Sequence, residues 1–162
     1  LLRDMGGAMT PFNAFMFIQG LETLALRVRE HSKNADEIAK FLMDHPKVER
    51  VVHPSVASDL AKERADKYLS GGCGGLMGFE IKGGIEAGKQ FINSLEMFYH
   101  VANIGDSRSL AMHPASTTHS QLNEEELLSA GVTPGYVRLS IGLEHLDDIK
   151  DDLTQALDKV SV

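Results

Sequence analysis

The chain has very little cysteine and no long apolar run, and each absence excludes a class of protein. Cys73 is the single cysteine in 162 residues, so neither an internal disulfide framework nor a cysteine-based zinc site is available. No apolar run reaches the length of about 18 to 20 residues that crosses a hydrocarbon core, and no basic-then-apolar signal segment opens the sequence. We therefore expect a soluble, cytoplasmic protein with no membrane partner.

Basic residues are also in the minority. The sequence has 16 Lys and Arg against 23 Asp and Glu, which gives a formal net charge of -7. This charge repels phosphate backbones, and no local cluster of Lys and Arg offsets it, so we expect no nucleic-acid partner. Hydrophobic residues make up 43% of the chain, enough for one domain to bury a core without disulfides or metal.

Hydrophobic spacing predicts an alternation of helices and strands. Thr10 and Pro11 are typical of a helix N-terminus, and the helix that follows is expected to continue or restart as far as Leu42 and to end near Pro46. We expect further helices at 61–69, 85–97, 123–130 and 146–160, and strands at 48–52, 76–81, 98–102, 109–112 and 136–141. This order predicts an α+β fold with one small, mostly antiparallel sheet covered by helices.

Two groups of residues resemble functional sites only superficially. The glycines around Cys73 lead into a strand and lack a following Gly-Lys-Ser/Thr, so a flexible entry to a strand is favoured over a phosphate loop. No cation or histidine beside Cys73 in the sequence favours a reactive thiol. His100, His113 and His119 have no i,i+4 spacing and no obvious carboxylate partner, so we expect structural hydrogen bonds for them and no metal.

Arg138 is a stronger candidate for a residue that binds a ligand. It stands between Val137 and Leu139 in an apolar strand, so its guanidinium is expected on the opposite face of the sheet, half-sheltered and in need of an anion. The planar fork of arginine suits a carboxylate bidentately. From periodicity alone, a structural salt bridge and a ligand-binding role are equally open.

Several segments, in chain order and over nearly the whole length, resemble the pyridoxal-phosphate enzymes of the cystathionine gamma-synthase type. They are residues 6–14, 20–24, 34–35, 48–54, 103–106, 109–110, 113–119 and 138–144. The resemblance implies the aspartate-aminotransferase type of fold, fold type I, with this chain as a single C-terminal domain. Residues 1–45 would form the linker helix region and 46–162 the α+β sandwich. The start at Leu1 agrees with a fragment that lacks the large catalytic domain.

Within that family, Asn103 and the Gly-Asp-Ser-Arg-Ser-Leu segment at 105–110 resemble the O-acetylhomoserine sulfhydrylase branch. The resemblance implies that Arg138 binds the substrate α-carboxylate, that Asn103 helps from its backbone or side chain, and that Thr118 lies near that pocket. It also implies that the lysine that forms the Schiff base, and with it the catalytic and cofactor-binding residues, lies outside this chain. Pyridoxal phosphate is therefore expected in the full-length enzyme and not on this fragment.

The reaction implied for the full-length transferase is a γ-replacement in methionine biosynthesis. Sulfide or a thiol displaces acetate from O-acetyl-L-homoserine, and sulfide gives homocysteine. The full enzymes are usually homotetramers, and the fragment alone is expected to be inactive, with an apolar helix at its start that drives association. Two alternatives stay open: the same domain of a methionine or cystathionine γ-lyase or synthase, and a non-catalytic stand-alone module.

Overall fold

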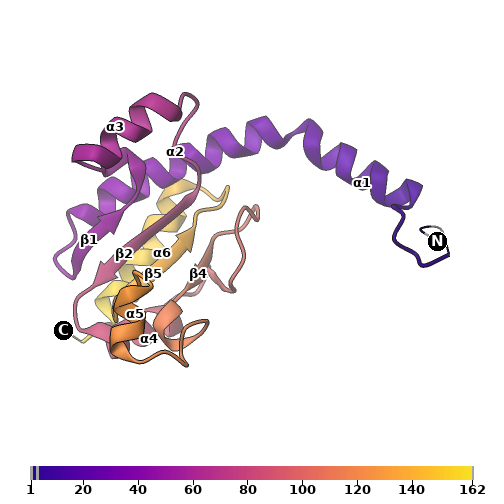
Figure 1. Ribbon diagram of the computed structural model, residues 1–162. Helices are drawn as coiled ribbons and strands as arrows, with labels where there is room; N and C mark the ends of the chain where they lie inside the picture. Colours follow the sequence, from indigo (N-terminus) through magenta and orange to yellow (C-terminus); the bar gives the residue numbers. More distant parts are fainter. Residues whose placement is uncertain (1, 3, 162) are drawn as a thin grey trace.

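The computed structural model describes residues 2 and 4–161, and helices and strands alternate along them (Figure 1). The helices are α1 (Pro11–Glu22), α2 (Leu24–Met43), α3 (Asp59–Tyr68), α4 (Gly84–Ser94), α5 (Glu124–Ser129) and α6 (Leu146–Asp158). The strands are β1 (Val48–Val52), β2 (Leu76–Ile81), β3 (Tyr99–His100), β4 (Leu110–Met112) and β5 (Tyr136–Ser140). Two short 3-10 turns, η1 (Pro54–Val56) and η2 (Pro114–Ser116), follow β1 and β4. Every helix and strand expected from the sequence is present, and the first helix does restart, at Leu24.

Within the described residues the strands form one sheet in the order β1-β2-β5-β4-β3. All neighbouring pairs are antiparallel except β3 and β4, which run parallel. The last strand of the chain, β5, therefore lies in the middle of the sheet, between β2 and β4. The predicted fold class, an α+β domain with a mostly antiparallel sheet, is confirmed.

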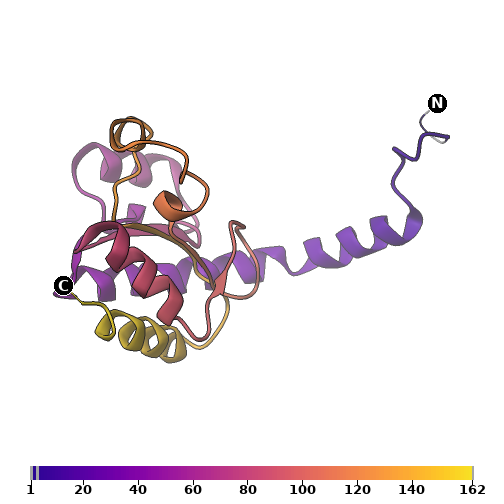
Figure 2. The same ribbon diagram turned by 90° about the horizontal axis from the view of Figure 1, so that it is seen from below.

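One face of the sheet is packed against α2, α4 and α6. Val137 and Leu139 of β5 and Phe79 of β2 are fully buried on this face, and Phe79 meets Phe91 of α4 edge to face, with ring centroids 5.3 Å apart. Figure 2 shows α4 and α6 together on this side of the sheet, with α5 on the other side.

Asp152 of α6 explains why α4 is shorter than expected. Its buried carboxylate accepts the backbone N–H groups of Glu96, Met97 and Phe98 at 2.9, 2.9 and 3.2 Å. These N–H groups are thereby committed to a side chain in a distant helix and not to an α-helical hydrogen bond. The helix predicted at 85–97 consequently ends at Ser94, and the strand predicted at 98–102 keeps only two residues.

The helix α1 extends away from the sheet and its covering helices (Figure 1) and has no buried residue. The Thr10 hydroxyl accepts the Asn13 backbone N–H at 3.2 Å and so caps its start. More than half of each of its large apolar side chains is exposed: Phe12, Phe15, Met16, Phe17, Ile18 and Leu21. The expected apolar surface is thus present, and association through it stays a prediction. Across residues 2 and 4–161, no helix is both long and apolar enough to span a bilayer.

His113 is buried and structural, as its sequence context predicts. Its ring nitrogens lie 2.8 Å from the Ser116 hydroxyl and 2.8 Å from the Pro134 carbonyl oxygen. Gly88 of α4 contacts the ring so closely that a Cβ atom at this position would overlap it. The imidazole is held by the nearby Ser116 hydroxyl and the more distant Pro134 carbonyl and is packed against Gly88, so it has little room to move.

We expect Gly88→Ala to lower the free energy of unfolding by about 1 to 3 kcal/mol, because a methyl group must be forced against a fixed ring. Urea denaturation measures this change. Gly20→Ala is the matched control, because nothing lies within 4 Å of a Cβ at this helical position, and it should be neutral or slightly stabilising. Equal midpoints for the two variants would contradict the close packing.

Stability should also fall at mildly acidic pH. Burial lowers the pKa of His113, and likewise the pKa of His53, below the ordinary value of 6.5. The unfolded chain binds these protons at the ordinary pKa, whereas the folded chain binds them only at lower pH. The contribution of the two histidines to the free energy of unfolding is therefore fully present above about pH 6.5 and declines as the pH falls below it. Urea midpoints at about pH 7.5 and about pH 5.5 test this, and an unchanged midpoint would contradict it.

Candidate functional site

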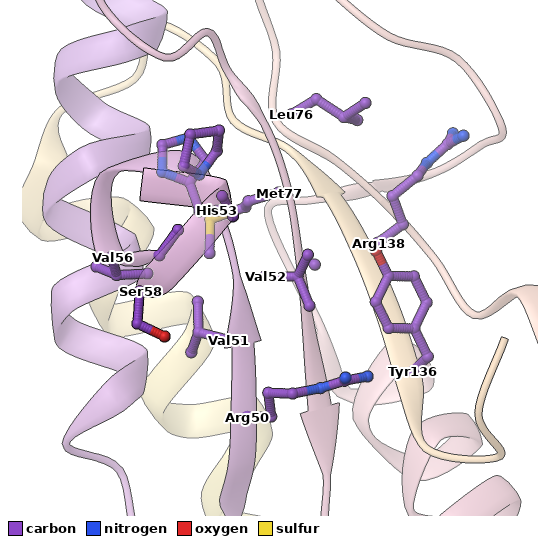
Figure 3. Close-up of a pocket in the computed structure, with 14 residues that line it drawn as sticks. Arg50, Val51, Val52, His53, Val56, Ser58, Leu76, Met77, Tyr136 and Arg138 are labelled. Carbon is purple, nitrogen blue, oxygen red and sulfur yellow. The ribbon is translucent and has the colours of Figure 1, made fainter. Parts of the chain in front are cut away.

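A cavity of about 680 Å³ opens on the face of the sheet opposite α2, α4 and α6, bounded by β1, β2 and β5 and by η1 and the segment that follows it. Figure 3 shows its wall, in which two arginines and one tyrosine are set among apolar side chains. Its lining includes the polar side chains of Arg50, Tyr136 and Arg138 and the exposed apolar side chains of Val52 and Leu76. An apolar cavity with a few polar groups is the usual form of a small-molecule site.

Arg138 reaches this cavity because successive side chains of β5 point to opposite faces of the sheet. Val137 and Leu139 are fully buried on the helix-covered face, so the side chain between them is directed to the other face. It is half-buried there and lies opposite Gly78 of β2. The predicted orientation is confirmed. Within residues 2 and 4–161 the guanidinium has no ion pair, and its one hydrogen bond goes to the Asn103 carbonyl oxygen at 3.2 Å.

Asn103 thus meets Arg138 through its backbone. Its side-chain oxygen accepts the neighbouring Ile104 N–H at 2.9 Å and is used locally. Thr118 does not join the two residues: it is exposed, its hydroxyl lies 2.8 Å from a ring nitrogen of His119, and it does not line the cavity. The structure brings together Arg138 and Asn103 of the three predicted residues, and the binding roles of all three stay predictions.

The loop that carries Asn103 is fastened to the end of β5. The Gly105 N–H donates to the Ser140 hydroxyl at 3.0 Å, and the Leu143 N–H donates to the Ser107 carbonyl oxygen at 2.8 Å. Because Ser140 is two residues beyond Arg138 and faces the same side of the sheet, these bonds fix the loop directly beside the guanidinium. The position of the Asn103 carbonyl follows from them.

A second fastening joins Ser109 to Glu144. The Glu144 carboxylate accepts the Ser109 N–H at 2.6 Å and the Ser109 hydroxyl at 2.9 Å, and the same hydroxyl accepts the Gly142 N–H at 2.9 Å. Gly142 is required here, since a Cβ atom would overlap both the carboxylate and the Ser109 nitrogen. The carboxylate therefore closes the loop at the end opposite to Asn103.

Tyr136 is a site residue that the sequence reasoning missed. Its ring lies over Gly78, where a Cβ atom would overlap the phenol. Burial raises the pKa of the Tyr136 hydroxyl, and the charges of Arg138 and Arg50 oppose this shift, so the phenol stays protonated near neutral pH. Period-two alternation places Tyr136 on the same face as Arg138 and could have identified it.

Cys73 does not line this cavity. Burial, with a contribution from Asp36, raises the pKa of the Cys73 thiol above its ordinary value, which leaves less of the reactive thiolate near neutral pH. Across residues 2 and 4–161, no group of three or more His, Cys, Asp or Glu side chains is arranged to hold a metal ion.

Comparisons with known proteins identify the family. The sequence profile described as "Cys/Met metabolism PLP-dependent enzyme" matches residues 1–158. An O-acetyl-L-homoserine sulfhydrylase of Leptospira meyeri is 55% identical over 98% of this chain and 36% of its own length. An L-methionine gamma-lyase of Fusobacterium nucleatum subsp. polymorphum is 43% identical over 98% of this chain and 40% of its own length.

A solved structure agrees with these matches. The crystal structure of a putative O-acetylhomoserine (thiol)-lyase from Campylobacter jejuni, which contains a pyridoxyl-lysine phosphate, superposes with a TM-score of 0.87 at 47% identity. The match covers 97% of this chain and 37% of that one. The chain belongs to the family of PLP-dependent enzymes of Cys/Met metabolism, whose fold is of type I. It spans a little over a third of the length of the relatives it matches.

The residues of this chain do not by themselves fit pyridoxal phosphate. Enzymes of this chemistry hold the cofactor as a Schiff base on a lysine, and no lysine within the described part of the chain lines the cavity. Lys82 donates to the Pro46 carbonyl oxygen and Lys89 pairs with Glu86, both at the surface. What the cavity wall offers is two arginines and a tyrosine among apolar side chains.

Replacing Glu144 should free the Asn103 loop. In Glu144→Ala the Ser109 N–H and hydroxyl lose their acceptor, so we expect the Ser109 amide to lose about 1 to 3 kcal/mol of hydrogen-exchange protection. Glu49→Ala, at an exposed position of β1, is the control and should stay within about 0.5 kcal/mol of the original chain. Unchanged protection in Glu144→Ala would show that other contacts hold the loop.

Proposed function

We propose that this chain is the C-terminal, substrate-carboxylate-binding domain of a pyridoxal-phosphate-dependent O-acetylhomoserine sulfhydrylase. The observation that carries the proposal is the Arg138 guanidinium, which is half-buried at the wall of the cavity and has no ion pair within residues 2 and 4–161. A sheltered cation without a counter-ion binds an anionic group strongly, and a guanidinium binds a carboxylate through two parallel hydrogen bonds. The similarity to sulfhydrylases supports the choice of an amino-acid substrate.

Arg138 would hold the substrate α-carboxylate and so fix the direction of the bonds at Cα. The Asn103 carbonyl accepts one N–H of the guanidinium, which orients the fork and leaves its other donors for the substrate. Thr118 is included from the resemblance alone, since it does not line the cavity. Positioning of this kind contributes to rate as well as to binding, since a misplaced reacting bond lowers the rate steeply.

In the complete protein, we propose, further residues beyond this chain complete the active site. A larger domain would supply the Schiff-base lysine and the cofactor, the reaction would replace the acetate of O-acetyl-L-homoserine by sulfide or a thiol, and the enzyme would be a homotetramer. The cofactor supplies the electron sink for chemistry at Cα when it is bound. The 162-residue chain alone would then be inactive.

In the complete protein we expect Arg138→Gln to lower kcat/KM for O-acetyl-L-homoserine by about 10² to 10³-fold, with KM raised and kcat lowered together. The physical reason is the loss of both binding and orientation of the carboxylate. Arg29→Gln, at an exposed position of α2, is the control and should leave kcat/KM unchanged. Wild-type kinetics in Arg138→Gln would overturn the role of Arg138.

A second candidate function is γ-elimination, favoured by the similarity to a methionine gamma-lyase. The same complete protein distinguishes the two reactions. A sulfhydrylase needs sulfide or a thiol to consume O-acetyl-L-homoserine rapidly, whereas a lyase forms an α-keto acid from methionine without an added thiol. Rapid keto-acid formation from methionine would replace the proposed reaction and would keep the role of Arg138.

A further inference from the structure

The buried ring of His53 joins three segments of the domain beside the cavity. His53 follows β1, serves as the N-cap of η1, and lines the cavity together with Val56 of η1 (Figure 3). One of its ring nitrogens faces Ser55, and the other faces Gly74 in the segment before β2. The proposed function gives this ring no role.

The two neighbours determine which ring nitrogen carries the proton. The Ser55 backbone N–H donates to Nδ1 at 3.4 Å, and the Ser55 hydroxyl lies 2.7 Å from the same atom. A backbone N–H can only donate, so Nδ1 has no proton. Nε2 lies 3.4 Å from the Gly74 carbonyl oxygen, which can only accept, so the proton is on Nε2. His53 is therefore neutral, and its Nδ1 lone pair caps η1.

A carboxylate oxygen of Asp36 lies near this lone pair and lacks a donor. Asp36 is on α2, and its Oδ1 atom is 3.7 Å from His53 Nδ1. This oxygen is buried and has no hydrogen-bond partner within residues 2 and 4–161. A buried acceptor without a donor is unfavourable, and burial within the domain keeps residues outside this chain from reaching it without a rearrangement. One proton on Nδ1 would supply the missing donor.

Asp36 is also the charged group that acts on the proton affinity of His53. Burial lowers the pKa of His53, whereas the Gly74 carbonyl and the Asp36 charge act in the opposite direction. The other charged groups in the surroundings are Lys40, which acts on Asp36, the ion pair of Lys62 and Asp66 on α3, and Arg50 and Arg138 on the cavity wall.

We propose that His53 and Asp36 form a pH-dependent switch that holds η1 at neutral pH and releases it in acid. When the ring takes up a proton from solvent, Nδ1 can no longer accept the Ser55 N–H, and the new N–H donates to Asp36 Oδ1. η1 then loses its cap, and the part of the cavity wall formed by Val56 becomes mobile. The switch does not depend on what the cavity binds.

The segment at Gly74 stays in place when the switch operates. Nε2 keeps its proton in both states and can keep donating to the Gly74 carbonyl oxygen. The Gly74 N–H also donates to the Ser32 hydroxyl of α2 at 3.0 Å. The change is therefore confined to η1 and to the two side chains of the switch.

Nitrogen NMR of the isotope-labelled 162-residue chain, from about pH 8 to about pH 4.5, tests the switch. We expect the Nε2–H tautomer of His53 at high pH, and a change in the Ser55 amide resonance with the same midpoint as the protonation of the ring. Asp36→Asn should lower this midpoint by about one pH unit, because the neighbouring negative charge is lost. His53→Gln identifies the ring resonances and should abolish the change at Ser55.

Asp44→Asn is the matched control, since it removes the same charge from an exposed position at the end of α2. Its midpoint should stay within about 0.3 pH units of that of the original chain, because solvent screens an exposed charge. A proton on Nδ1 at high pH, or equal midpoints in Asp36→Asn and the original chain, would overturn the switch.

Crystal structures of the complete protein at about pH 7.5 and about pH 4.5 give a second test that does not require the 162-residue chain to be studied alone. At the lower pH the distance from His53 Nδ1 to Asp36 Oδ1 should fall from 3.7 Å to about 2.8 Å. The Ser55 nitrogen should move out of hydrogen-bonding range of Nδ1. A ring that stays bonded to the Ser55 N–H at both pH values would contradict the proposal.

Discussion

On β5, Val137 and Leu139 are fully buried against the helix layer, and Arg138 between them must face the opposite side of the sheet. The free energy of burying these two side chains, about 1.5 to 3 kcal/mol each, therefore also fixes the direction of the guanidinium. A shift of β5 by one residue would expose the apolar side chains and bury the charge. The core and the cavity wall thus depend on the same register.

The polar contacts around the cavity also depend on the register of β5. The bonds from Gly105 to Ser140 and from Ser109 to Glu144 fasten a loop to the end of β5, so the Asn103 carbonyl is set by the same strand that sets Arg138. On the other side, β2 offers Gly78, whose lack of a side chain gives space to the Tyr136 ring. The site is a property of three neighbouring strands and one loop.

Much of the fold could be predicted from the sequence because its signals are local. Apolar periodicity located most helices and strands, cap and turn residues helped to locate the others, and the alternation of side chains along β5 predicted the orientation of Arg138. The pairing of β1 with β2, which brings Arg50 to the cavity, and the clamp between Ser109 and Glu144 join residues far apart in the sequence, so no local pattern reveals them. The early end of α4 has the same cause, since Asp152 is more than fifty residues away from the N–H groups it accepts.

A crystal structure of the complete protein with a bound amino-acid substrate analogue would show whether Arg138 holds the substrate carboxylate. We expect the α-carboxylate within hydrogen-bonding distance of two Arg138 nitrogens, with the Asn103 carbonyl still bonded to the guanidinium. A carboxylate bound elsewhere, with Arg138 paired to an acidic side chain from another part of the protein, would contradict it and would make Arg138 a structural ion pair.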